Sequence, residues 1–241
     1  MKGRLKALGA VSAILLAVAL FFFAAGRIRS SLMVSAGLPD RPVIVLDPGH
    51  GGMDGGAIGS GGVIEKDLNL EIALRLRDFL TLSGYEVRMT RDSDCSIHDE
   101  GLTSVREQKR SDMHNRLKLM ESCGDAVVLS IHQNQFAQSR YSGAQMFYGK
   151  QNPESRALAQ SIQSAFRQLQ PDNKREIKPG GKELYLLWEC SQPIVLVECG
   201  FISNPEECAA LQDAGYQCRV AFAVLAGLLQ SGGEADGGQQ T

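Results

Sequence analysis

Residues 43–65 read V-I-V-L-D-P-G-H-G-G-M-D-G-G-A-I-G-S-G-G-V-I-E, and the rest of the chain is organised around this stretch. It opens with a short apolar, β-branched run after a proline, which predicts a buried strand over residues 43–46. The strand breaks at Asp47-Pro48-Gly49, and a loop with eight glycines leads from there to a predicted helix starting at Glu65. Because ligands bind beyond the carboxyl ends of strands in open α/β sheets, His50 and Glu65 are candidates for half of a metal site.

A glycine-rich loop after a strand also suits the binding of a phosphate group. The nucleotide-binding motifs depend on the spacings G-x-G-x-x-G and G-x-x-x-x-G-K-[ST], and neither can be read in residues 43–65. A nucleotide site is therefore not supported. Because His-Gly-Gly in a loop is by itself a weak signal, the metal hypothesis depends on residues further along the chain.

Length and composition indicate one large globular domain. The chain has 241 residues, of which 44% are hydrophobic, and a formal net charge of −2 that gives no reason to expect a nucleic-acid partner. The six cysteines form no C-x-x-C pair, which argues against a structural zinc ribbon. Several lie in apolar runs, so we expect reduced cysteines buried in the core.

The N-terminus predicts export. Three basic residues, Lys2, Arg4 and Lys6, precede an uncharged run over residues 7–26, which is long enough for a membrane-spanning helix. A cleavage site of small residues at 34–36 lies well beyond this run, so an uncleaved anchor is favoured over a cleaved signal. Basic residues before the span place the N-terminus inside the cytoplasm and the rest of the chain outside it.

Strands and helices alternate through the remainder of the chain. This predicts one α/β domain with a twisted, mostly parallel or mixed sheet of about six strands and helices on both faces. We expect a signal or anchor segment at residues 1–30, a linker at 31–41, a catalytic domain at 42–230 and a flexible tail at 231–241. Strands are predicted at residues 43–46, 85–90, 126–131, 143–148, 183–187 and 193–198, and helices at 65–83, 104–122, 152–169 and 214–230, with a short helix opening at Asn204-Pro205.

Three predicted strands end in a residue that can bind a metal, namely His50, His132 and Glu198, and Glu65 is a fourth candidate. Two neutral imidazoles and a carboxylate are a common zinc triad, which leaves one position open for water. A further carboxylate beside that position can accept a proton. Each residue alone has an ordinary explanation, such as a backbone hydrogen bond or the helix dipole. Four such coincidences at the ends of successive elements are not expected.

Four motifs resemble, in the same order, those of the zinc-dependent N-acetylmuramoyl-L-alanine amidases. They are D-P-G-H-G-G at 47–52, E-K-D-L-N-L at 65–70, S-I-H-Q-N at 130–134 and V-E-C-G-F-I-S-N at 197–204. The resemblance implies an α/β domain with one zinc ion bound by His50, Glu65 and His132, and Glu198 as the catalytic carboxylate. The implied substrate is peptidoglycan, and the implied reaction is hydrolysis of the amide between the muramic acid lactyl group and L-alanine of the stem peptide.

The whole-chain layout and the run I-K-P-G-G-K-E-L-Y-L-L at 177–187 are similar to the spore-cortex, germination-specific subgroup of endospore formers. That resemblance implies action on the forespore cortex before muramic-δ-lactam is made. Gln135 and Cys199 stand where the family usually has small residues, so the wall of the pocket is expected to differ. The sequence leaves open whether activity requires an accessory exported protein.

Two other functions remain to be weighed. An amidase fold without catalytic activity, which binds the cell wall or acts as a scaffold for a partner, would have lost a metal ligand or Glu198. This chain has lost neither. A zinc carboxypeptidase acting on stem peptides is the other alternative, and analysis of the reaction products would separate it from an amidase. The remaining histidines, His98 and His114, lie among polar residues, so we expect both to face solvent.

Overall fold

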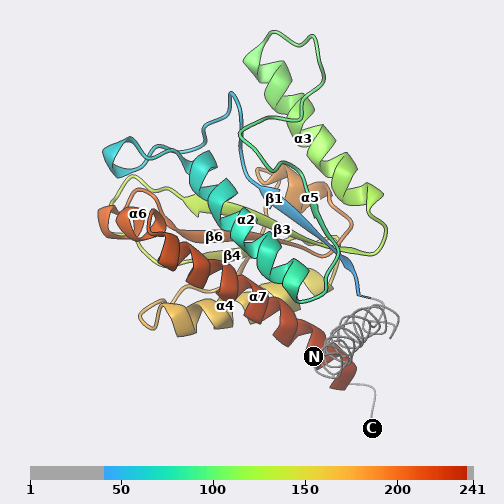
Figure 1. The fold of residues 1–241 in the computed structure, drawn as a ribbon, viewed down its shortest axis with the longest axis vertical. Helices are drawn as coiled ribbons and strands as arrows, with labels where there is room; N and C mark the ends of the chain where they lie inside the picture. The colour runs from blue at the N-terminus through green and yellow to red at the C-terminus, as the bar shows by residue number, and fades with distance from the viewer. Residues whose placement is uncertain (1–40, 238–241) are drawn as a thin grey trace, which may run out of the picture. The chain divides into compact units, whose positions relative to one another are not determined.

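A mixed sheet with the strand order β2-β1-β3-β6-β4-β5 runs through the protein. The computed structural model describes residues 41–237, so the anchor expected at residues 1–30 and nearly all of the linker lie outside the described part. From Pro42 onward the chain forms one α/β unit, as the alternation of elements predicts (Figure 1). The strands are β1 (Val43–Pro48), β2 (Val87–Met89), β3 (Ala126–Asn134), β4 (Gln145–Tyr148), β5 (Lys178–Pro179) and β6 (Ile194–Phe201).

The direction of the strands decides where the site can form. β1 pairs in parallel with β2 and β3, and β3 pairs in parallel with β6, so the carboxyl ends of β1, β3 and β6 meet at one edge. β4 runs antiparallel to β6, and β5 pairs in parallel with β4. The three strand ends that carry His50, His132 and Glu198 therefore lie next to one another.

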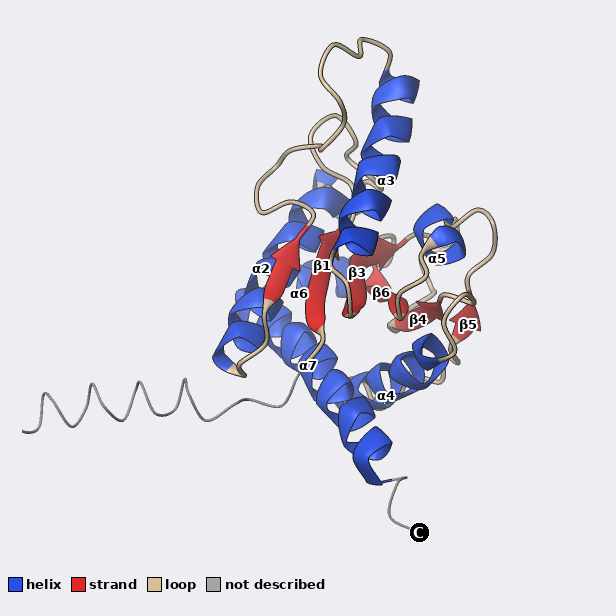
Figure 2. Cartoon of the chain, turned by 90° about the vertical axis from the view of Figure 1, so that its right-hand side faces the viewer, coloured by secondary structure: helices blue, strands red, loops and turns tan. Residues whose placement is uncertain are grey.

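Helices cover both faces of the sheet, as expected. One face packs against α2, α4 and α7 in the larger of two apolar clusters, and the other face packs against α3 and α5 (Figures 1 and 2). α2 shows why these residues form a helix, because Leu68, Ile72, Leu76 and Leu80 recur every four residues and are all buried. The helices are α2 (Glu65–Leu82), α3 (Val105–Ser122), α4 (Glu154–Leu169), α5 (Tyr185–Glu189), α6 (Pro205–Leu211) and α7 (Ala214–Gly237), with a short 3-10 turn, η1 (Ser60–Gly62).

The strand predicted at residues 183–187 is wrong. These residues lead into the helix α5, and the adjacent side chains of Leu186 and Leu187 are both buried against the face that carries α3. Two consecutive buried side chains do not fit the alternation of a strand, which places neighbours on opposite faces. The place beside β4 at the sheet edge is taken instead by Lys178 and Pro179.

The predicted cap of α6 is confirmed, whereas α4 begins at Glu154, with Pro153 rather than Asn152 at the N-cap position. Asn204 accepts hydrogen bonds from the backbone N–H groups of Glu206 and Glu207 and so caps α6. The side chain of Asn152 accepts a bond from the N–H of Glu154 at the start of α4. The last helix is longer than predicted, because α7 continues beyond Gln230 to Gly237.

The six cysteines are all free thiols, and half of them are buried as expected: Cys190, Cys199 and Cys208 lie in the core. Cys95 and Cys123 are half-buried and Cys218 is exposed, so the expectation of core cysteines holds only in part. Over residues 41–237, none of the helices combines the length and apolar character needed to cross a membrane.

Two glycines of α7 provide a test of how this helix packs. A Cβ at Gly227 would lie 2.5 Å from the Cα of Ile162 on α4, whereas a Cβ at Gly232 would meet nothing within 4 Å. We expect Gly227→Ala to destabilise the fold by about 1–3 kcal/mol, because it overpacks the helix contact. Gly232→Ala should stabilise it by about 0.5–1 kcal/mol through helix propensity alone. Urea unfolding measures both, and equal shifts would contradict the packing of α7 on α4.

Candidate metal centre

His50 is held in an unusual backbone conformation just after β1. Its φ of 63° lies in the left-handed region, which residues other than glycine rarely adopt, and it is the one such non-glycine residue among those described. The preceding residue must be a glycine, because the imidazole of His132 lies against the backbone of Gly49. A Cβ there would lie 2.1 Å from Nε2 of His132. The D-P-G-H motif thus turns the chain and leaves room for the second imidazole.

Glu65 is the first residue of α2, and its side chain is buried with an exposed fraction of 4%. The backbone N–H of Ala57 donates to Oε2 at 2.8 Å, and the N–H of Gln133 donates to Oε1 at 3.2 Å. Asn69, one turn further along α2, donates to the same oxygen at 3.3 Å. Both carboxylate oxygens are therefore fixed in position by the protein.

The two imidazoles approach this carboxylate from different strands. Nε2 of His50 lies 3.3 Å from Oε2 of Glu65, and Nδ1 of His132 lies 3.0 Å from Oε1. One ligand atom from each of the three residues falls within 4.8 Å of the others, which is close enough to hold one metal ion. The structure thus brings together the three residues that the resemblance assigns to zinc, and their two nitrogens and one oxygen are a donor set that suits it.

Asp54 orients the first imidazole. Its Oδ2 lies 2.9 Å from Nδ1 of His50, and its Oδ1 pairs with Nζ of Lys109 on α3 at 2.8 Å. Burial lowers the pKa of His50, but the hydrogen bonds to Asp54 and Glu65 outweigh it and raise that pKa to about 9. A carboxylate behind the imidazole is the usual partner of a metal-binding histidine, because it fixes the ring and leaves the other nitrogen for the metal.

Glu198 faces the same site from β6, where it pairs in register with His132 on β3. The residue is only half-buried, yet its Oε2 is buried and has no hydrogen-bond partner. Burial raises its pKa to about 7, and the negative charge of Glu65 adds to this while His132 and His50 oppose it. A structural role in the turn after β6 is not supported, because the N–H of Phe201 donates to Glu207.

The arrangement could hold a metal ion and places an additional carboxylate beside it, and comparison with known proteins identifies the family of the chain. A family model described as N-acetylmuramoyl-L-alanine amidase matches residues 44–230. The chain belongs to this amidase family. It is a hydrolase that cleaves the N-acetylmuramoyl-L-alanine bond of peptidoglycan, and the resemblance of its four motifs is confirmed.

Individual relatives support the same assignment. The germination-specific N-acetylmuramoyl-L-alanine amidase of Bacillus subtilis is 39% identical over 188 residues, which cover 78% of each chain. Among solved structures, the CwlD amidase of Clostridioides difficile, in complex with the GerS lipoprotein, is 38% identical with a TM-score of 0.77 and covers 80% of this chain and 99% of that one. The catalytic domain of CwlV from Bacillus (Paenibacillus) polymyxa is 30% identical with a TM-score of 0.66, over 79% and 97% respectively.

A buried ion pair supports the strand end that presents His50 in the amidase. Asp47 and Arg116 are each 1% exposed, and Nη1 of Arg116 lies 2.6 Å from Oδ1 of Asp47. The hydroxyls of Thr90 and Ser130 also donate to this carboxylate. Burial raises the pKa of Asp47, but the charge of Arg116 and the two hydroxyls hold it below its ordinary value. The pair is therefore fully ionised and hydrogen-bonded inside the protein.

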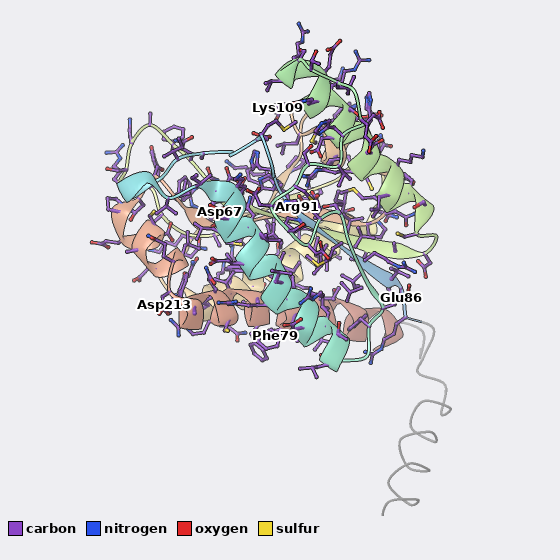
Figure 3. All side chains as sticks on the ribbon, turned by 45° about the horizontal axis from the view of Figure 1, so that its top comes forward. Asp67, Phe79, Glu86, Arg91, Lys109 and Asp213 are labelled. Carbon is purple, nitrogen blue, oxygen red and sulfur yellow. The ribbon has the colours of Figure 1, made fainter. Side chains whose placement is uncertain are left out.

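Arg116 and Arg91 together bind the backbone of the metal-binding loop. Arg116 donates to the carbonyl oxygens of Pro48 and His50, and Arg91 donates to those of Pro48 and Gly49. Figure 3 shows Arg91 in the middle of the molecule, and it also reaches α2 by donating to the carbonyl of Lys66. The carbonyls of Pro48, Gly49 and His50, at the end of β1 and just after it, thus each accept a hydrogen bond from a guanidinium group.

Several of these supporting residues were not assigned a role from the sequence. Asn69 stands four residues after Glu65, so helical spacing could have placed its side chain beside the carboxylate. Asp47 could have been recognised as a charge inside a buried strand. Arg116 gave no signal, because an arginine on a polar helix is usually exposed. Of the other histidines, His114 is exposed as expected, whereas His98 is half-buried and within hydrogen-bond distance of Ser96.

The ion pair gives a prediction for stability. Arg116→Met should destabilise the amidase by about 3–5 kcal/mol, because it leaves the carboxylate of Asp47 buried without a charged partner. In the double variant Asp47→Asn/Arg116→Met the buried charge of Asp47 is removed as well and only Asp112, the second carboxylate paired with Arg116, loses its partner, so part of that loss should be recovered. Chemical unfolding of the two variants and the wild type measures this, and a double variant less stable than Arg116→Met would contradict it.

Proposed function

We propose that the amidase binds one zinc ion through His50, Glu65 and His132 and uses Glu198 as its catalytic carboxylate. The observation that carries the proposal is the convergence of the three ligand atoms within 4.8 Å, next to a buried carboxylate oxygen that has no partner. When bound, zinc would polarise the scissile carbonyl and lower the pKa of a water molecule.

Glu198 moves the proton in this proposal. Its carboxylate accepts a proton as the amide is attacked and returns it to the amide nitrogen, so that the stem peptide leaves as an amine. In the absence of a metal ion, burial raises the pKa of this carboxylate to about 7. A bound cation would lower this pKa and keep the resting carboxylate ionised.

Substitutions should distinguish the residues that bind the metal ion from the residue that transfers the proton. His132→Ala removes one of three ligands, so zinc and activity should be lost together. Glu198→Gln should retain zinc and lose activity by about 10²–10⁴-fold, because the general base contributes that much. Zinc content, melting temperature and amide cleavage are measured on the same purified samples.

Two outcomes would contradict these assignments. A folded, zinc-replete Glu198→Gln or Glu198→Ala protein with near wild-type cleavage would remove Glu198 from the mechanism. A His132→Ala protein that still holds stoichiometric zinc would remove His132 from the ligand set. Analysis of the cleaved products by mass spectrometry also excludes or establishes the carboxypeptidase alternative.

We further propose that the amidase acts on the spore cortex, where stem-peptide removal precedes formation of muramic-δ-lactam. The proposal is supported by the germination-specific function that the Bacillus subtilis relative carries in its name. The match extends over 188 residues and covers 78% of both chains.

A strain lacking the amidase should make spores whose cortex contains little or no muramic-δ-lactam, because the stem peptides that block lactam formation stay in place. Muropeptide mass analysis of purified spores measures this directly, and complementation with the Glu198→Gln variant should not restore the lactam. Normal lactam content in the deletion strain would contradict the cortex proposal but not the amidase activity.

The remaining proposals concern location and partners. We propose that residues 1–30 anchor the exported protein in the membrane and that 31–41 are a linker; of the tail expected at 231–241, residues up to Gly237 belong to α7. If so, fractionation should find the full chain in membranes and residues 38–241 in the soluble fraction. We also infer an accessory exported protein, since a solved relative is described in complex with a lipoprotein. Purification of the tagged amidase from sporulating cells without any enriched exported protein would contradict this.

A further inference from the structure

Arg175 lies on a platform of aromatic rings between α4 and β5. Its Cζ is 4.3 Å from the ring centroid of Phe201, at the end of β6, and 5.9 Å from that of Tyr141. Phe201 is itself buried, so one face of the guanidinium is fixed against the protein. An arginine held flat in this way presents its nitrogens at its edge in a defined direction.

Among the described residues no carboxylate forms a contact ion pair with Arg175, and the charge of Glu207 acts on it only from a greater distance. Nε donates to the carbonyl of Ser142 at 2.7 Å and Nη1 donates to Oε1 of Gln145 at 3.3 Å, but no carboxylate forms an ion pair with it. Burial lowers its pKa, against the opposing charge of Glu207. Of the two buried arginines described above, Arg116 has two carboxylate partners, and Arg91 donates from all three of its nitrogens to backbone carbonyls. A half-buried guanidinium without a carboxylate partner is suited to bind an anion.

The position of Arg175 connects it to the catalytic carboxylate. Its partner Gln145 lies on β4 directly opposite Glu198 on β6, and Glu198 lies in register with His132 on β3. Residues in register on neighbouring strands point to the same face of the sheet. The side chains of His132, Glu198 and Gln145 therefore form a row on one face, and Arg175 stands at its end.

Carboxylates lie at the other end of this row, around the metal centre. Glu65, Asp54 and Glu198 surround the metal centre, whereas a peptidoglycan stem peptide is itself an anion. Its second residue is joined to the third through a side-chain carboxyl, so its α-carboxylate is free and lies close to the scissile amide. A cation placed beside the row attracts this carboxylate and favours one orientation of the substrate.

We propose that Arg175 binds a free carboxylate of the stem peptide and so positions the scissile amide over the metal centre. This inference rests on the amidase activity and on the proposed roles of His132 and Glu198. The α-carboxylate of the second stem residue is the expected ligand, because it is the one nearest to the bond that is cleaved. A planar guanidinium can bind a carboxylate through two parallel hydrogen bonds, which fixes direction as well as distance.

The experiment compares a stem-peptide muropeptide with analogues in which one carboxylate is converted to an amide. Separate analogues are amidated at the second residue, at the third residue and at the carboxyl terminus. In the wild type, amidation at the carboxylate that Arg175 binds should lower kcat/KM by about ten-fold or more, the scale of a charge-assisted hydrogen bond. In Arg175→Gln this preference should fall to within about two-fold of unity, because the charge on the protein side is gone.

The ratio of kcat/KM for the muropeptide with the free carboxylate to kcat/KM for its amidated analogue distinguishes binding of that carboxylate by Arg175 from an effect of Arg175 on the fold. A purely structural role of Arg175 in holding Ser142 and Gln145 would lower both values equally and leave the ratio unchanged. Arg140→Gln is the matched control, because Arg140 is exposed and its guanidinium lies 5.4 Å from the same Tyr141 ring. That variant should keep the wild-type ratio.

A second readout does not need turnover. Isothermal titration calorimetry of the free stem peptide and its amidated analogues measures the same preference as a ratio of dissociation constants in wild type and Arg175→Gln. The identity of the discriminating analogue shows which carboxylate is bound. The proposal is overturned if no amidation changes binding or kcat/KM in the wild type, or if Arg175→Gln retains the wild-type preference. Absence of cleavage by the wild type would count against the proposed mechanism instead, and the binding ratio would still decide the role of Arg175.

Discussion

The ion pair of Asp47 with Arg116 is the contact on which the catalytic edge depends. Both charges are out of water, so each must be matched by the other and by the hydroxyls and carbonyls around them. In return, Arg116 fixes the backbone at Pro48 and His50, where the strand's own hydrogen bonds end and the chain enters a left-handed turn. Without such donors that turn would bury unsatisfied carbonyl groups. The position of the His50 imidazole therefore depends on Arg116 of the helix α3.

Much of the fold and the four candidate site residues could be predicted from the sequence by local rules, whereas the division of those four into ligands and base came from the resemblance of the motifs. Apolar runs mark the strands, and parallel strands bring His50, His132 and Glu198 to one edge. The rest depends on contacts between distant segments, which composition and spacing do not encode. Arg116 looks like an exposed helix residue until its partner on β1 is known. The helix α5 was missed because an apolar run of five residues has no periodicity of its own.

Glu65 and Glu198 show how different surroundings give two carboxyl groups of the same site different pKa values. Burial raises the pKa of Glu65, but contacts with both imidazoles outweigh it and hold the pKa far below its ordinary value. Glu198 is raised to about 7 because it has no donor to offset burial. Residue types alone left open which carboxylate binds metal and which carries the proton. The neighbours agree with the roles proposed for them, since a stabilised anion suits a metal ligand and an unstabilised one suits a base.

The antiparallel direction of β4 has a consequence for how this enzyme can diversify. Because β4 begins at the edge where β3 and β6 end, residues 135–144 do not cross the sheet through a helix. They form a strap over the carboxyl end of β6, where Tyr141 lies beside Phe201. Insertions or deletions in this strap would reshape the rim around the scissile bond without moving any core helix. Evolution can therefore alter substrate choice there independently of the stability of the metal centre.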